Sequence, residues 1–253
     1  MCETCGCAVT DSSSHSHDNT IEVLASLKAD NDLTAAHNRA HFNAAGVLVI
    51  NLMSSPGAGK TSLLEATIEA LASRCKIAVI EGDLETENDA ERIRAKGVPA
   101  VQITTGSACH LDAHMIHHAI HSLPLEDLDL LFIENVGNLV CPASFDLGQH
   151  ANVALLSTPE GDDKPQKYPV MFRAVDLVLI TKTDLLPVLD DFDCDAVADH
   201  VKQLANPAPV LRLSAKHGDI APWLDWLEDK LATRRQKPFT FVAHHHHHTI
   251  KPV

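Results

Sequence analysis

Short, almost continuous apolar runs separated by amphipathic stretches constrain the fold of this chain more than any other feature. Such strands, with little alternation of polar and apolar residues, are typical of a mostly parallel sheet that helices cover on both faces. We therefore expect one α/β domain with a mostly parallel sheet of about seven strands. The runs span residues 47–53, 76–81, 98–104, 128–134, 152–158, 176–181 and 208–213.

The rest of the chain divides into two terminal segments and a leading helical region. Residues 1–20 are rich in Cys, Ser and His, which indicates a flexible metal-binding tail. The predicted domain spans 21–243, and its first part, 21–45, carries a broken helical pattern that predicts one or two helices. The run His244–His248 opens a tail over 244–253 that is either native or a cloning remnant.

Composition and charge exclude several classes of partner. A formal charge of -14 and an aromatic share of 4% argue against binding to nucleic acid. No apolar run reaches the roughly 18 residues that a membrane helix needs, and the N-terminus lacks the pattern of a secretory signal. The 7 cysteines, an odd number, fit a reducing compartment better than a disulfide framework. We expect a cytoplasmic protein without a nucleic-acid or membrane partner.

The first apolar run leads directly into SSPGAGKTS, which we interpret as a phosphate-binding P-loop. Its glycines let backbone N–H groups surround phosphate oxygens, Lys60 is expected to reach the β- and γ-phosphates, and the Thr61 hydroxyl to bind Mg²⁺. Ser54 stands where this motif usually has its first glycine. The candidate nucleotide-binding residues of the loop are Ser55, Pro56, Gly57, Ala58, Gly59, Lys60, Thr61 and Ser62.

Two elements further along the chain favour guanine over adenine. TKTD at 181–184 resembles the guanine-reading box of GTPases, in which Asp184 would accept hydrogen bonds from the N1 and N2 donors that adenine lacks. The sequence SAK at 214–216 resembles the element that packs against the O6 edge of guanine. We therefore expect GTP and GDP as ligands. The candidate base-site residues are Lys182, Asp184, Ser214, Ala215 and Lys216.

Three further residues are candidates for the hydrolysis step. Asp83 follows the second apolar run, where carboxylates of this superfamily approach Mg²⁺. Glu134 and Gly137 resemble a DxxG motif with Glu in place of Asp, so the Gly137 N–H could contact the γ-phosphate and Glu134 could hold a magnesium-bound water. A solvated acid at the end of a strand is the alternative for each carboxylate. No catalytic glutamine or arginine finger is evident, so we expect slow turnover.

A second group of residues has the composition of a transition-metal site. Cys109 and His110 are expected at a helix start, with His114 four residues on along the same helical face, and Cys141 follows Gly137. Thiolate and imidazole donors are typical of Zn²⁺ or Ni²⁺ sites. Single buried cysteines are the alternative. We expect structural roles for Cys75 and Cys194, and solvent-facing side chains at His117, His118 and His121.

The chain resembles the hydrogenase nickel-incorporation GTPases, the HypB-type accessory proteins of [NiFe]-hydrogenase maturation. The resemblance covers nearly everything from residue 33 to the end, and its most specific parts are FIENVGNLVCP and CHLDA. Related urease-accessory GTPases carry a Cys-Pro-His motif that this sequence lacks. The resemblance implies GTP hydrolysis, nickel as cargo, a HypA-type partner, a hydrogenase large-subunit precursor as recipient, and a homodimer with the Cys109, His110 and Cys141 region at the subunit contact.

The first seven residues, MCETCGC, resemble the CxxCGC nickel motif that some members of this family carry. Cys2, Cys5 and Cys7 could wrap one ion, with the α-amine close by as a fourth donor. Planar coordination by sulfur and nitrogen suits Ni²⁺, whereas a tetrahedral arrangement would suit Zn²⁺, so both metals stay open. A terminal tether would let such a site deliver its ion elsewhere.

The favoured function is a GTP-dependent nickel metallochaperone that delivers nickel to a [NiFe]-hydrogenase precursor. One competing hypothesis is a nickel storage protein whose GTP site is largely structural. Another is a zinc-handling GTPase. Nickel transfer that responds to the nucleotide state would separate the first from the second.

Overall fold

The structure is a computed structural model that describes residues 14–83, 87–106 and 108–236, with side chains from residue 26 to residue 235 of those ranges. The predicted metal ligands Cys2, Cys5 and Cys7 and the run His244–His248 lie outside the described residues. Among the helices that the structure describes, none is long and apolar enough to cross a membrane.

A single sheet of 7 strands forms the centre of the domain, in the order β3-β2-β4-β1-β5-β6-β7. Every pair of neighbouring strands is parallel, and all the predicted apolar runs become strands, so the predicted fold class is confirmed. The strands are β1 (Leu48–Ser54), β2 (Ile77–Asp83), β3 (Ala100–Thr104), β4 (Leu130–Glu134), β5 (Ala151–Ser157), β6 (Leu177–Thr181) and β7 (Val210–Arg212).

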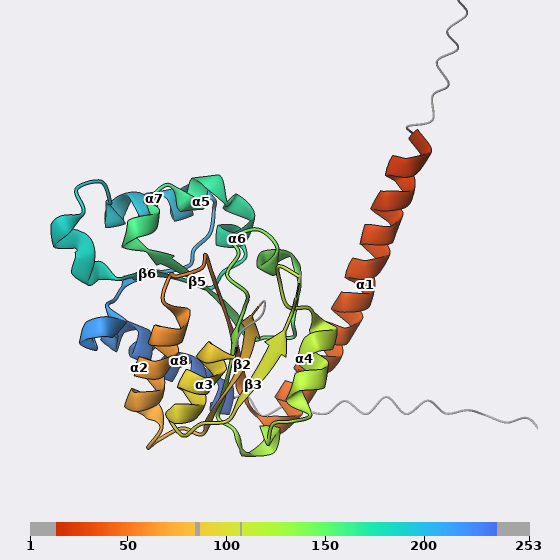
Figure 1. Ribbon diagram of the computed structural model, residues 1–253, viewed down its shortest axis with the longest axis horizontal. Helices are drawn as coiled ribbons and strands as arrows, with labels where there is room; N and C mark the ends of the chain where they lie inside the picture. The colour runs from red at the N-terminus through yellow and green to blue at the C-terminus, as the bar shows by residue number, and fades with distance from the viewer. Residues whose placement is uncertain (1–13, 84–86, 107, 237–253) are drawn as a thin grey trace, which may run out of the picture.

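Helices connect these strands and cover both faces of the sheet (Figure 1). The α-helices are α1 (Ser14–Ala45), α2 (Lys60–Leu71), α3 (Asn88–Ala95), α4 (Ala113–Ile120), α5 (Lys164–Lys167), α6 (Pro169–Arg173), α7 (Cys194–Gln203) and α8 (Ala221–Gln236). Short 3-10 helices are η1 (Leu125–Asp127), η2 (Pro142–Ser144), η3 (Thr158–Glu160), η4 (Thr183–Val188) and η5 (Ala215–His217).

The apolar strands divide their side chains between two layers of helices. In β4, Leu130 and Phe132 pack in the core under α2, α3 and α8, which includes the fully buried Trp223. Leu131 and Ile133 point to the other face, where α1 and α4 cover them. Because side chains alternate along a strand, a strand with helices on both faces must be apolar at nearly every position.

The helix α1 begins earlier than the sequence predicts. The expected boundary at residue 20 falls inside it, and 21–45 forms part of one continuous helix. No Gly or Pro interrupts residues 14–45, so nothing in the chain stops the helix from propagating. Figure 1 shows its N-terminal turns extending away from the sheet, while its C-terminal half packs beside α4.

Polar contacts hold the C-terminal half of α1 on the domain. The Asn31 amide donates to the carbonyl oxygen of Asp146 over 2.9 Å. The guanidinium of Arg39 lies 2.7 Å from the Asp146 carboxylate, and the buried Asn38 donates to the carbonyl oxygen of Leu147 over 3.2 Å. These side chains satisfy backbone groups of the loop before β5, which explains why a helix with a weak apolar pattern docks at a defined place.

Candidate nucleotide and metal sites

The loop between β1 and α2 is shaped to surround phosphate. Gly57 and Gly59 have positive φ values of 76° and 96°, which glycine adopts without the steric cost of a side chain. The helix α2 begins at Lys60, and the free N–H groups of a helix N-terminus stabilise an anion. Thr181 at the end of β6 donates from Oγ1 to the carbonyl oxygen of Ala58 over 2.7 Å, which fixes the loop on the sheet.

Ser54, which replaces the first glycine of the motif, holds the lysine of the loop. It is fully buried at the end of β1, and its hydroxyl donates to the carbonyl oxygen of Ser55 over 2.6 Å. The Ser54 hydroxyl oxygen also accepts from Lys60 Nζ over 3.1 Å, and Nζ lies 3.8 Å from Glu134 Oε1. The departure from the motif therefore supplies a hydrogen-bond acceptor that keeps Lys60 in the phosphate site.

Thr61 and Glu134 form the side of the site that suits Mg²⁺. The Thr61 hydroxyl donates to Glu134 Oε1 over 3.0 Å. Glu134 is 5% exposed, and its other oxygen, Oε2, is buried without a hydrogen-bond partner among the described residues. A hydroxyl beside an unpartnered carboxylate oxygen is the kind of hard-oxygen donor set that Mg²⁺ prefers. These residues therefore fit the ion that the P-loop implies.

A second buried carboxyl group, Glu81, lies beside Glu134. The two residues are directly opposite in the pairing of β2 with β4, and Glu81 Oε1 also has no described hydrogen-bond partner. Burial, followed by the charge of Glu134, raises the pKa of Glu81 to about 11, so this group holds a proton at neutral pH. Burial raises the pKa of Glu134 as well, but the charge of Lys60 opposes that change. Because Glu134 accepts from Thr61 and lies 3.8 Å from Lys60 Nζ, we place the proton of the pair on Glu81.

The phosphate cavity has a volume of about 430 Å³ and includes all the residues predicted for hydrolysis. Asp83, at the end of β2, lines it together with Lys60 and Glu134. Gly137 lies against the P-loop, where an added Cβ would be 2.9 Å from the backbone of Pro56. A glycine is therefore required for this segment to approach the loop so closely.

A neighbouring cavity of about 500 Å³ contains the predicted base-site residues Lys182, Asp184, Ala215 and Lys216. Ser214 Oγ donates to Asp184 Oδ1 over 2.7 Å, and this bond is the main cause that lowers the pKa of Asp184. Because Ser214 occupies one oxygen and holds the carboxylate ionised, Asp184 can accept further donors, such as the N1 and N2 groups of guanine. Ser214 thus orients the aspartate, rather than lining the cavity as the motif predicts.

Lys182 connects the two cavities. It has a positive φ of 57°, unusual for a residue other than glycine, and it lines both the phosphate and the base cavity. Its carbonyl oxygen accepts from Thr158 Oγ1 over 2.9 Å, which anchors the turn after β6. The phosphate loop and the base site are thus adjacent, as one nucleotide requires.

The side chains of Cys109, His110 and Cys141 lie close together. The first two residues follow β3 in the chain, and Cys141 follows β4. The two Sγ atoms are 2.9 Å apart without a disulfide, and Cys109 Sγ is 3.7 Å from His110 Nδ1. Their donor atoms all lie within 4.8 Å of one another, which is compact enough for one ion. The His110 ring stacks on Phe145, and burial lowers the pKa of His110, so the imidazole is neutral and ready to bind a metal.

Asn135 ties this donor set to the phosphate cavity. It follows Glu134 directly, and its Oδ1 accepts from the backbone N–H of Leu111, one residue after His110, over 3.2 Å. Asn138 Oδ1 accepts from the backbone N–H of Cys141 over 3.4 Å. The loop with Cys109 and the turn with Cys141 are therefore both hydrogen-bonded to asparagines in the segment that follows β4.

The structure does not bring His114 to this cluster. The carboxylate of Asp112 accepts from the backbone N–H of Met115 over 2.8 Å and caps α4, which therefore begins at Ala113. His110 precedes the helix, so it cannot share a helical face with His114 as expected. His114 Nε2 lies instead 3.3 Å from Thr34 Oγ1 on α1.

Sequence reasoning missed Glu81 as a residue of the site. It falls within the apolar run of β2, and the signal that could have found it is a carboxyl group in a strand that is buried on both faces. Such a group needs a neutral form or a partner, which points to a site. The two cysteines expected to be structural lie elsewhere: Cys194 is buried and Cys75 packs against the core beneath α2.

The chain is similar in sequence to known proteins. Residues 48–212 match the family described as CobW/HypB/UreG, nucleotide-binding domain. The chain is 54% identical over 215 residues to the hydrogenase maturation factor HypB of Azotobacter vinelandii, covering 85% of this chain and 71% of that protein.

Two solved structures are similar over most of the chain. The crystal structure of HypB from Helicobacter pylori in complex with nickel has a TM-score of 0.78 at 44% identity, covering 84% of this chain and 100% of that one. The hydrogenase maturation factor HypB from Archaeoglobus fulgidus has a TM-score of 0.74 at 40% identity, covering 80% and 99%.

Proposed function

Because the chain belongs to the HypB family of hydrogenase maturation factors, we propose that it is a GTP-hydrolysing nickel metallochaperone. In this proposal the protein binds Ni(II) and delivers it to the large-subunit precursor of a [NiFe]-hydrogenase in the cytoplasm. A nickel complex of the similar Helicobacter pylori protein supports nickel as the cargo. The observation that carries the proposal is the hydrogen bond from Leu111 to Asn135, which joins the Cys109 and His110 loop to the end of β4.

The residues of the phosphate cavity divide the work of hydrolysis. Lys60 places a positive charge at the β- and γ-phosphates, and the backbone N–H of Gly137 lies on the segment that would face the γ-phosphate. Thr61 Oγ1 and the Glu134 carboxylate would hold Mg²⁺, with Asp83 as a further oxygen donor. The ion, when bound, supplies charge neutralisation on the phosphate oxygens. Glu81 is neutral next to Glu134, so the buried pair contributes one carboxylate charge towards the metal.

Asp184 gives the proposed preference for GTP and GDP over adenine nucleotides. Its carboxylate, oriented by Ser214, can pair with both the N1 and N2 donors of guanine, whereas adenine offers an acceptor at N1. Lys216 Nζ lies 3.9 Å from Asp184 Oδ2, which places the SAK element at the same edge of the base site. A buried acceptor left unpaired by the wrong base costs about 1–3 kcal/mol.

Cys109, His110 and Cys141 would hold the nickel ion, and Zn²⁺ is the alternative metal for the same donors. Val140, beside Cys141, is 58% exposed, which offers an apolar contact for a second copy of the chain. We propose that the protein acts as a homodimer through this region and works with a HypA-type nickel accessory protein. The tail residues Cys2, Cys5 and Cys7 are the proposed second nickel site.

Nickel transfer in defined nucleotide states tests the proposal. The protein is loaded with Ni²⁺ and mixed with an apo hydrogenase large-subunit precursor and a HypA-type protein, in the presence of GTP, GDP or a non-hydrolysable GTP analogue. We expect the rate or extent of transfer to differ between these states. Transfer that is equal in all three would favour a nickel storage protein with a structural GTP site. A clear preference for zinc at both cysteine sites would favour a zinc-handling GTPase.

A further inference from the structure

A cluster of histidine rings lies between α1 and α4, separate from the cysteine site. His37 and His41 are one helical turn apart on α1, and their Nε2 atoms are 3.1 Å from each other. The ring of His117 on α4 is centred 5.1 Å from that of His37 and 6.0 Å from that of His41. His121, one turn further along α4, has its ring 4.9 Å from that of His117.

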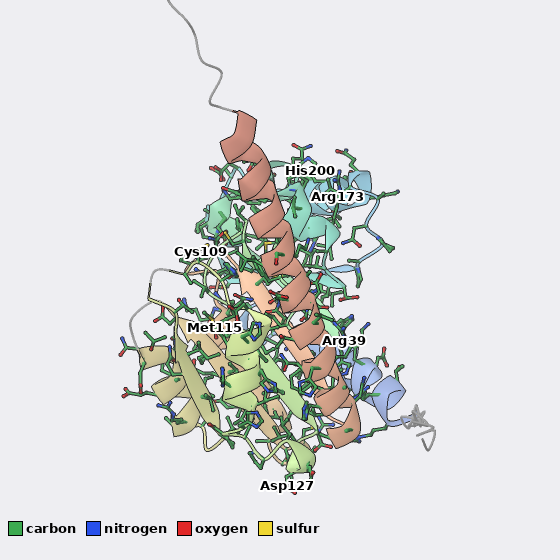
Figure 2. All side chains as sticks on the ribbon, turned by 90° about the vertical axis from the view of Figure 1, so that its right-hand side faces the viewer. Arg39, Cys109, Met115, Asp127, Arg173 and His200 are labelled. Carbon is green, nitrogen blue, oxygen red and sulfur yellow. The ribbon has the colours of Figure 1, made fainter. Side chains whose placement is uncertain are left out.

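The two helices that carry these rings are packed together. Figure 2 shows α1 running beside α4, which carries the labelled Met115. His37 and His41 are exposed on α1, so their rings can turn without disturbing the core. His117 is only partly exposed, which differs from the solvent-facing position expected from the sequence.

The buried side chain of Asn38 fixes the tautomer of His117. The Asn38 amide nitrogen donates to the carbonyl oxygens of Ala113 and Leu147, over 2.8 Å and 3.2 Å. Its Oδ1 must therefore be the acceptor that faces His117 Nδ1, 3.0 Å away. His117 Nδ1 carries the proton, and Nε2 keeps a free lone pair. A ring N–H bonded to an amide or carboxylate oxygen is the usual way in which a protein orients a metal-binding imidazole.

We propose that His37, His41 and His117 form a binding site for a divalent late transition-metal ion such as Ni²⁺. Imidazoles that bond one ion through Nε2 at about 2.1 Å have ring centres roughly 4.5–6 Å apart, for ligand angles from about 90° upward. The separations of 4.5, 5.1 and 6.0 Å among these three rings all fall in that range. Imidazole nitrogen suits Ni²⁺, Zn²⁺ and Cu²⁺ and is a poor ligand for Mg²⁺.

The separations of the ring centres suit a shared ion, but the donor nitrogens do not converge in this conformation. Among the described residues, Cys109, His110 and Cys141 are the set whose donors already lie within 4.8 Å of one another. The exposed rings of His37 and His41 must therefore turn towards His117 Nε2.

The site goes beyond the proposed nickel transfer and can be tested without it. The test uses full-length protein in which Cys2, Cys5, Cys7, Cys109 and Cys141 are changed to Ser, and His15, His17 and His244–His248 to Asn. Removing these donors eliminates the cysteine sites and the terminal histidines. Ni²⁺ alone is then titrated by calorimetry into this background and into its His37→Asn, His117→Asn and His118→Asn derivatives. Folding of each is checked by circular dichroism.

His118→Asn is the matched control, because His118 is exposed on the same helix as His117. The centres of these two rings are 6.2 Å apart. We expect one Ni²⁺ to bind the background protein and His118→Asn equally. His37→Asn and His117→Asn should each weaken binding by more than about tenfold, since loss of an outer-shell partner alone typically costs about 10–100-fold. Equal Ni²⁺ affinity in the background and in His37→Asn would overturn the proposal.

A second readout follows from the position of the ligands on two helices. An ion held by His37 and His117 links α1 to α4 in the folded state alone, so Ni²⁺ should raise the thermal midpoint of the background protein. Because His37 is exposed, His37→Asn should hardly change the thermal midpoint of the metal-free protein. Ni²⁺ should not raise the midpoint of this variant. A midpoint that rises equally in both proteins would mean that Ni²⁺ binds elsewhere, and the proposed site would be rejected.

Discussion

Glu81 and Glu134 are paired on β2 and β4, and both line the phosphate cavity. Two carboxylates this close cannot both be ionised without a cation between them, so one proton remains on the pair. Lys60 and Thr61 both contact Glu134, which places the charge there and the proton on Glu81. The phosphate site therefore depends on a residue that carries no charge.

The first prediction is that Glu81→Gln becomes progressively more stable than the wild type as pH rises. With a pKa of about 11, folded Glu81 keeps a proton that the unfolded chain loses above about pH 4.5. The free energy of unfolding of the wild type therefore falls with rising pH, by at most about 1.4 kcal/mol per pH unit from this group. Glutamine mimics the neutral acid, so the free energy of unfolding of Glu81→Gln should not decrease in this way. Urea unfolding of both proteins at pH 6 and pH 9 measures the two free energies.

The exposed Glu91 provides a control for this comparison. Glu91→Gln changes the same functional group at an exposed position of α3, so its effect on stability should not depend on pH over this range. If Glu81→Gln and Glu91→Gln behaved alike between pH 6 and pH 9, Glu81 would be ionised in the folded protein. The description of the carboxyl pair would then be wrong.

The second prediction concerns the base. Asp184→Ala should reduce the preference for GDP over ADP by about 5–150-fold, because the loss of hydrogen bonds to guanine is worth about 1–3 kcal/mol. Ser214→Ala should have a smaller effect in the same direction, since it frees the aspartate to turn but keeps its acceptors. Competition of GDP and ADP for a fluorescent nucleotide measures the preference. Equal binding of the two nucleotides by the unaltered protein would contradict the assignment.

At the scale of elements, the segment from Glu134 to Cys141 belongs to both sites. Glu134 ends β4 in the phosphate cavity, Gly137 packs on Pro56 of the P-loop, and Cys141 meets Cys109. Asn135 binds the loop that carries Cys109. A displacement of Gly137 by a γ-phosphate would therefore move one cysteine relative to the other.

The third prediction is that the nucleotide state changes metal affinity at Cys109, His110 and Cys141. Allosteric coupling of this kind is typically about 1–3 kcal/mol, or about 5–150-fold. Ni²⁺ is titrated into a variant with Cys2, Cys5 and Cys7 changed to Ala, with GDP or with a non-hydrolysable GTP analogue. By reciprocity, loading the metal must change the ratio of the two nucleotide affinities by the same factor.

Asn135→Ala is the informative companion variant, because it removes the bond to the Cys109 loop and leaves all metal ligands in place. We expect weaker coupling in this variant, with both metal and nucleotide still bound. Identical metal affinities in the two nucleotide states of the unaltered Asn135 protein would leave a metal site without a switch. The storage hypothesis would then be preferred.

At the scale of the whole molecule, the sheet could be predicted because its cause is local. The five inner strands, β1, β2, β4, β5 and β6, are buried on both faces, and this burial appears in the sequence as a nearly continuous apolar run, as in β4. The P-loop and Asp184 could also be predicted from the sequence, since a few neighbouring residues carry each motif. The P-loop follows β1 and Asp184 follows β6. They lie at the same edge of the sheet because parallel strands all end at that edge.

Features that depend on contacts between distant segments could not be predicted. The position of α1 depends on Asn31 and Asn38, whose partners Asp146 and Leu147 lie on a loop far away in the chain. The capping of α4 by Asp112 moves the helix start past His110, which a helical pattern alone does not show. The grouping of His37 with His117 exists only once α1 has packed on α4.

The last prediction treats the protein as two independent modules. Lys60→Ala removes the positive charge that Ser54 and Glu134 hold in the phosphate cavity, so GTP hydrolysis should fall by at least about 100-fold. Ni²⁺ binding at Cys2, Cys5 and Cys7 should be unchanged, because these donors all lie within the first seven residues and the proposed set includes no residue of the nucleotide site. Phosphate release and Ni²⁺ titration, compared with a Cys2, Cys5 and Cys7 to Ala variant, measure both properties. A Lys60→Ala protein that lost the nickel bound by the tail cysteines would show that the tail depends on the nucleotide site, and the two modules would have to be described as one.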